Sequence, residues 1–128
     1  MRKSLALVVM LILALAVARP GFSAAPVKVP TPMWAVVNVD GSLARGRSAV
    51  SSAQLGVDGQ YEVVFNRDVS ACAYVASGGE ATPNSPDDAV VFTVAPRDSN
   101  PDAVFVQEWD GVLARDSYSS GFHLIVLC

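Results

Sequence analysis

The sequence predicts an all-β fold, an antiparallel β-sandwich of about eight or nine short strands with an internal hairpin repeat. Two observations lead to this prediction. After the N-terminal region, short runs rich in Val, Tyr, Phe and Trp recur at regular spacing, each bounded by Gly, Pro, Asp, Asn or Ser. In the same part of the chain, no window carries apolar residues at helical spacing over ten or more positions.

Each expected strand is a short apolar run between turn residues; the runs are 34–39, 42–45, 49–55, 61–65, 72–77, 89–95, 103–109, 112–115 and 122–128. Asp40-Gly41 joins the first two runs and predicts a two-residue hairpin, because such turns require residues with φ > 0. The stretch GVDGQ predicts a second hairpin with a longer loop. The long polar stretch 78–88 is expected to be a loop.

A short phrase is repeated: VDGSLAR (39–45) returns as WDGVLAR (109–115). We interpret the repeat as a duplicated structural unit, two related hairpins that face each other across one core. Trp109 then stands at the position of Val39, and Arg115 at that of Arg45. The functional alternative is that Arg45 and Arg115 form a paired ligand contact.

The first 24 residues are typical of a signal peptide. Arg2 and Lys3 precede the apolar run 4–18, and small residues follow a Pro-Gly break. The run is shorter than the roughly 20 residues that span a bilayer. A retained anchor helix is the alternative. Residues 25–33 hold three prolines and predict an extended linker, which leaves 34–128 as the β-sandwich domain of a secreted protein.

Loss of the signal peptide changes the charge balance. Removal of Arg2, Lys3 and Arg19 lowers the nine basic residues to six, against twelve acidic ones, a net charge of −6. Nucleic acids and anionic membranes attract basic surfaces, so neither is expected as a partner, and no membrane contact is expected after signal cleavage.

The two cysteines, Cys72 and Cys128, predict one disulfide, because an even number of cysteines in an exported protein favours a disulfide bond. A catalytic or metal-bound cysteine is the alternative. Neither cysteine has a cluster of further ligands or a basic neighbour in the sequence.

The sequence lacks the residue set of a hydrolase. The only histidine, His123, lies in a run where Phe122, Leu124 and Val126 are expected to face the core, which points His123 to solvent. No Gly-x-Ser-x-Gly motif is present. We therefore expect a non-enzymatic protein without a cofactor, with a small hydrolase as the minor alternative.

A calcium site is a further possibility in the stretch DSNPD. Asp98, Asn100 and Asp102 alternate as at the start of an EF-hand loop, but Ala103 and Trp109 replace the Gly and Glu that such a loop requires. The simpler interpretation is a turn built from turn-forming residues.

Two aromatic residues are candidates for ligand contact. Trp109 stands next to the second Asp-Gly turn, and Tyr118 lies in the polar stretch DSYSSG. Amphipathic rings that are partly exposed suit carbohydrate or another surface protein as partner. The competing function is a secreted protease inhibitor that presents the 78–88 loop.

The runs WAVVNVDGSLARG, YEVVFNRDVSACAYVAS and FHLIVLC resemble a β-rich module of unknown function in secreted actinobacterial proteins. They are also similar to β-sandwich modules near the ends of phage tail fibres. The resemblance covers Trp34 to Cys128 and concerns turns and strands. It implies a non-enzymatic β-sandwich used for display or recognition, with no catalytic set to carry over.

Overall fold

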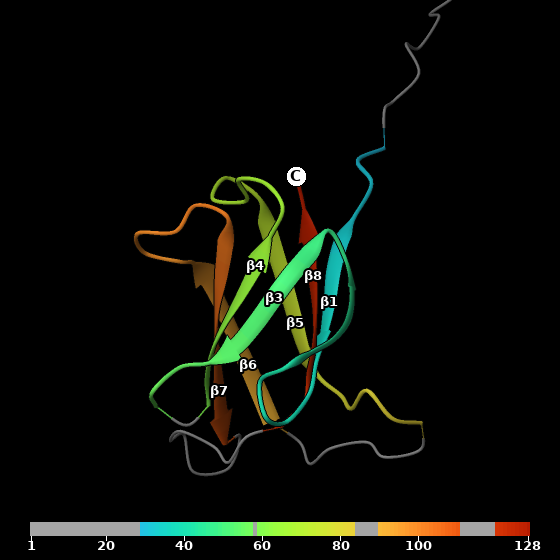
Figure 1. Cartoon of the computed structure of the whole chain (residues 1–128), viewed down its shortest axis with the longest axis vertical. Helices are drawn as coiled ribbons and strands as arrows, with labels where there is room; N and C mark the ends of the chain where they lie inside the picture. Colours follow the sequence, from blue (N-terminus) through green and yellow to red (C-terminus); the bar gives the residue numbers. More distant parts are fainter. Residues whose placement is uncertain (1–28, 58, 84–89, 111–119) are drawn as a thin grey trace, which may run out of the picture.

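The computed structural model describes residues 29–57, 59–83, 90–110 and 120–128. These residues form an antiparallel β-sandwich of two four-stranded sheets, which confirms the predicted fold class (Figure 1). The strands are β1 (Met33–Val37), β2 (Leu43–Arg47), β3 (Ala49–Gln54), β4 (Gln60–Phe65), β5 (Ala73–Gly78), β6 (Val90–Pro96), β7 (Ala103–Asp110) and β8 (Phe122–Leu127). Sheet A has the order β2-β1-β8-β5, and sheet B has the order β3-β4-β7-β6.

Each of these eight strands was expected from its run of apolar residues, and their ends differ from the expected ones by no more than a few positions. The ninth expected run, 112–115, lies outside the described residues, as do the signal peptide and residues 25–28 of the linker.

The turn between β1 and β2 is longer than the predicted two-residue hairpin. The Gly41 N–H donates to the Asn38 carbonyl (2.9 Å), and the Asn38 N–H donates to the Ser42 carbonyl (2.9 Å). Gly41 has a φ of 81°, whereas Asp40 has no positive φ. The turn thus has three central residues and a left-handed glycine. Asp40 prefers this geometry because its carboxylate accepts hydrogen bonds from the N–H (2.9 Å) and hydroxyl (2.6 Å) of Ser42.

One residue carries the chain from sheet A into sheet B. Ser48 alone separates β2 from β3 and has a φ of 64°. Its carbonyl accepts a hydrogen bond from the Asn66 N–H (2.9 Å), which fastens the corner to the end of β4. Strands that bend in this way connect the two layers of a sandwich at its side.

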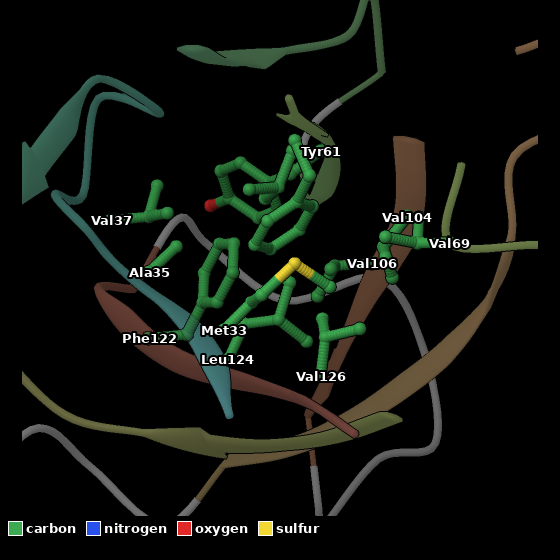
Figure 2. Close-up of a cluster of buried hydrophobic side chains, with 12 residues drawn as sticks. Met33, Ala35, Val37, Tyr61, Val69, Val104, Val106, Phe122, Leu124 and Val126 are labelled. Carbon is green, nitrogen blue, oxygen red and sulfur yellow. The ribbon is translucent and has the colours of Figure 1, made fainter. Parts of the chain in front are cut away.

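The core lies between the sheets and is built from alternate residues of the central strands, with Val69 added from the segment between β4 and β5 (Figure 2). Its fully or nearly fully buried members are Met33, Ala35, Val37, Tyr61, Val63, Phe65, Val69, Val104, Val106, Phe122, Leu124 and Val126. The ring centroids of Tyr61 and Phe122 are 5.0 Å apart, so these two rings pack the sheets together. In β8, buried and exposed residues alternate, which confirms that His123 faces outward.

The predicted disulfide is present between Cys72 and Cys128, whose Cα atoms are 4.5 Å apart. Cys72 precedes β5 and Cys128 follows β8, and these two strands are paired in sheet A. The bond therefore ties together the ends of two neighbouring strands.

The two copies of the repeated phrase do not have the same local structure where both are described. Val39 lies in the turn after β1, whereas Trp109 lies within β7 and pairs with Val91. The register of β7 against β6 continues to Asp110, so pairing with β6 extends the strand through the start of the second copy. Residues 111–115, including Gly111 and Arg115, lie outside the described part.

Candidate functional site

Arg45, one of the candidate ligand contacts, holds the start of the 78–88 loop. It is exposed on β2, and its guanidinium donates a hydrogen bond to the carbonyl of Ala81 (3.0 Å). Arg115, its expected partner, and Tyr118 lie outside the described residues. Arg45 therefore contacts the protein's own backbone.

The segment Gly79–Ala81, here called the strap, passes from β5 beside β8 to β2. The Gly79 N–H donates to the Gly121 carbonyl (3.1 Å), and a ring nitrogen of His123 lies 3.4 Å from the Glu80 carbonyl oxygen. In Figure 1 the chain after β5 runs from the lower end of that strand towards the side where β1 lies. His123 is thus placed as a contact of the strap.

The strap lies over a row of residues on the outer face of sheet A. Val36 pairs with Arg45 on one side and with His123 on the other. Val36 alternates with the core residues Ala35 and Val37, yet only 6% of it is exposed. This outward-facing apolar side chain therefore lies between Arg45 and His123, the two residues that contact the strap.

The stretch Asp98–Asp102 forms the turn between β6 and β7. The amide oxygen of Asn100 accepts a hydrogen bond from the Asp102 N–H (3.3 Å), and the Ala103 N–H donates to the Asn100 carbonyl (3.1 Å). Across the described ranges, no three His, Cys, Asp or Glu side chains are grouped so that they could hold a metal ion. The hydrogen bonds of Asn100 therefore stabilise a turn.

Trp109 lies on the outer face of sheet B, in the last part of β7. Its indole N–H donates to the hydroxyl of Thr93 on β6 (3.1 Å). Thr93 pairs with Gln107, two residues before Trp109 in β7, so the ring reaches diagonally from β7 across β6. Trp109 is half-buried, and its direct partner Val91 is 52% exposed. The hydrogen bond fixes the ring and leaves part of it open to solvent.

A second group on the same face lies closer to the β6–β7 turn. The guanidinium carbon of Arg97 is 5.9 Å from the centre of the Phe105 ring. The Arg97 Nε donates to the carboxylate of Glu62 on β4 (2.9 Å). Side-chain exposure of Arg97 and Glu62 is 33% and 26%, so both remain accessible. A guanidinium over an aromatic ring combines an electrostatic attraction with apolar packing.

These two groups form one surface, here called the platform, on three neighbouring strands of sheet B and on Arg97, the residue that follows β6. Its members are Glu62, Val91, Thr93, Arg97, Phe105 and Trp109. Trp109 was expected from the sequence as a candidate contact, whereas the other five members were missed. The sequence pattern indicates which residues of these strands face away from the core. It does not indicate the strand order that brings the five residues together.

Glu108 is a buried carboxylate that sequence reasoning also missed. It is fully buried, and one oxygen accepts hydrogen bonds from the Ser120 N–H (2.9 Å) and the Tyr61 hydroxyl (3.3 Å). Its other oxygen has no hydrogen-bond partner among the residues that the structure describes. The carboxylate links β7 to β4 and to the residue two positions before β8, which is a structural role.

The shifted pKa values lie away from the platform. Hydrogen bonds from the hydroxyl and then the N–H of Ser42 lower the pKa of Asp40, and the same two groups of Ser70 lower the pKa of Asp68. Burial raises the pKa of Tyr74, and the negative charge of Asp68 adds to this effect. Each of the two aspartates stabilises a turn with its carboxylate.

Two further surface features are present. A recess of about 430 Å³ beside the disulfide is lined by Val29, Pro30, Thr31, Arg67 and Cys128. On the outer face of sheet A, Val75 and Ile125 are 57% and 44% exposed and are paired with each other. Neither feature combines fixed aromatic rings with polar groups as the platform does.

No protein-family model matches this chain, and neither do curated proteins or solved structures. A search of the described ranges for a helix long and apolar enough to cross a membrane finds none.

Proposed function

We propose that the protein is exported and acts as a non-enzymatic binding module, with the platform on the outer face of sheet B as its contact surface. The observation that carries this proposal is the ordered and partly exposed ring of Trp109. Its ring is fixed by the hydrogen bond to Thr93 and is still partly exposed. A large ring that is already ordered loses little conformational entropy when a ligand covers it.

Export is supported by the disulfide and by the N-terminal sequence. Disulfides persist in oxidising compartments outside the cytosol, and the Cys72–Cys128 bond joins the ends of two neighbouring strands. The charged start and apolar run of residues 2–18 have the pattern of an export signal. N-terminal sequencing of the protein from culture supernatant tests this part, and a membrane-bound chain with residues 1–18 intact would contradict it.

Binding is tested by incubating fluorescently labelled protein, residues 25–128, with a panel of intact bacterial and eukaryotic cells. Trp109→Ala should abolish retention on the cells that bind the wild-type protein. Ile125→Ala is the matched control, because Ile125 is an exposed apolar residue on the opposite outer face. Equal retention of wild type and Trp109→Ala would contradict the platform as the contact surface.

A second candidate function is inhibition of a secreted protease, and the strap favours it. An inhibitor must present its loop rigidly. Arg45, His123 and Gly121 hold the start of the 78–88 loop through its backbone. Limited proteolysis distinguishes the two functions: an inhibitor loop resists cleavage and blocks the protease, whereas rapid cleavage between 78 and 88 with undiminished protease activity excludes inhibition.

A further inference from the structure

The platform presents apolar ring surface next to polar groups that remain able to bind. The indole N–H of Trp109 is occupied by Thr93, so a ligand meets the face of the ring. The Nη groups of Arg97 and the second carboxylate oxygen of Glu62 have no hydrogen-bond partner within the described part of the chain. The surface thus offers both donors and acceptors beside apolar rings.

The charges of the platform cancel. Arg97 and Glu62 form an ion pair 2.9 Å apart, and the other members are uncharged. A ligand with a strong charge of either sign would compete with this pair and gain little from the remainder of the surface. The matching ligand is neutral, has hydroxyl groups that both donate and accept, and has apolar faces that can lie on an aromatic ring. A pyranose sugar has this combination.

The spacing of the aromatic rings indicates a ligand of several units. Phe105 and Trp109 lie on the same face of β7, four residues apart, which corresponds to about 13 Å along a strand. A single sugar ring cannot contact both. Gln107 lies between them, is only 6% exposed, and donates from its amide to the carbonyls of Gly59 and Glu108.

From these contacts we infer that the platform binds a neutral oligosaccharide, which lies along β7 with one sugar stacked on Trp109 and another beside Phe105 and Arg97. The inference rests on the proposed binding function and assigns the ligand class to it.

The test uses the two tryptophans of the chain, one on each outer face. Trp34→Phe leaves Trp109 as the only tryptophan, and Trp109→Phe leaves Trp34. The protein is first screened on an array of neutral oligosaccharides with and without EDTA, and the ligands found are then titrated in solution. Tryptophan fluorescence should change in the Trp34→Phe protein and stay constant in Trp109→Phe. Trp109→Phe should keep the wild-type melting temperature.

Affinity gives a second readout. Trp109→Ala should weaken binding by about tenfold or more, as expected for truncation of a central aromatic contact. Thr93→Val, which frees the ring without removing it, should weaken binding less. The corresponding monosaccharides should bind about tenfold more weakly than the oligosaccharides, because they lose the second contact.

Three outcomes would overturn the inference: no binding of any neutral oligosaccharide at millimolar concentration, unchanged affinity in Trp109→Ala, or binding that EDTA abolishes. The cell assay separates this failure from failure of the proposed function. If retention on cells requires Trp109 but survives periodate oxidation of the surface sugars, the binding function stands and the carbohydrate assignment is wrong.

Discussion

Gly41→Val is the sharpest test of the fold, because the structure predicts two separate costs for it. Gly41 has a φ of 81°, a region that costs a residue with a Cβ about 1–2 kcal/mol. A Cβ at this position would also lie 2.9 Å from the Cβ and 3.0 Å from the Cα of Gln54, so β3 would have to move. Such overpacking costs about 1–3 kcal/mol. Together the free energy of unfolding should fall by about 2–5 kcal/mol.

In a domain of this size, that loss lowers the melting temperature by about 10 °C or more, which thermal unfolding followed by circular dichroism measures directly. Gly56→Val is the matched control. A Cβ at Gly56 meets no heavy atom within 4 Å, and its φ is not in the left-handed region. This variant should stay within about 0.5 kcal/mol of wild type. Equal melting temperatures for Gly41→Val and wild type would refute the reasoning, and an equal loss in Gly56→Val would show that valine itself is responsible.

The repeated phrase extends this test to Gly111, which lies outside the described residues. The repeat predicts that Gly111→Val should cost about as much as Gly41→Val, although Asp40 lies in a turn whereas Asp110 pairs with Val90 within β7. Clearly different losses in the two variants would show that the two turns have different structures.

Further predictions concern the disulfide, the buried carboxylate and a turn. Replacing Cys72 and Cys128 by Ala should lower the free energy of unfolding by about 4 kcal/mol in urea melts, because the bond closes a loop with a sequence separation of 56 residues. An unchanged urea midpoint would contradict this. Glu108→Gln should be at least as stable as wild type. Glu108→Ala should lose about 1–3 kcal/mol, because the buried Ser120 N–H loses its carboxylate acceptor and the Tyr61 hydroxyl loses the shorter of its contacts to Glu108 (3.3 Å) and the Ser120 carbonyl (3.5 Å); equal thermal losses in both variants would show that the carboxylate is needed for another reason. Ser70→Ala should raise the pKa of Asp68 towards its ordinary value of 3.8 in an NMR titration, because the Ser70 hydroxyl is the main cause of the lowered value. Since the folded pKa is the lower one, this hydrogen bond stabilises the fold above pH 3.8 and the stabilisation is lost as pH falls through the folded value.

Local sequence patterns were sufficient to predict the positions of the eight described strands and the disulfide. Each strand is a short run; burial alternates clearly in β4 and β8, whereas β1 is mostly buried and β2 mostly exposed, and the turns between strands are marked by Gly, Asp, Asn and Pro. With two cysteines in the chain, only one intramolecular pairing was available. The turn after β1 differs from its prediction because the Asp40 carboxylate binds Ser42, a side-chain effect that the Asp-Gly pair alone does not reveal.

The platform and the strap depend on contacts between residues far apart in the chain. Arg97 reaches Glu62 because β4, β7 and β6 are neighbours, an order that periodicity does not encode. Arg45 was expected to be a ligand contact because it recurs in the repeat, yet its partner in the structure is the carbonyl of Ala81. An exposed arginine on a strand is equally suited to either partner, and only the path of the loop after β5 decides between them.

The end of β7 bears on the binding role that we propose for Trp109. Two consecutive residues occupy positions that are unusual for their side chains. The acidic Glu108 is buried, and the aromatic Trp109 faces outward. A shift of β7 by one residue would bury Trp109, but it would also turn the core residues Val104 and Val106 to solvent, so the register is fixed. Trp109 is half-buried, so packing across β6 accounts for part of the ring, and the remaining exposed part is the surface that the proposed binding function would use. Departures from the pattern that folding requires are concentrated at functional sites, and here the departure coincides with a ring that Thr93 holds in place on an accessible face.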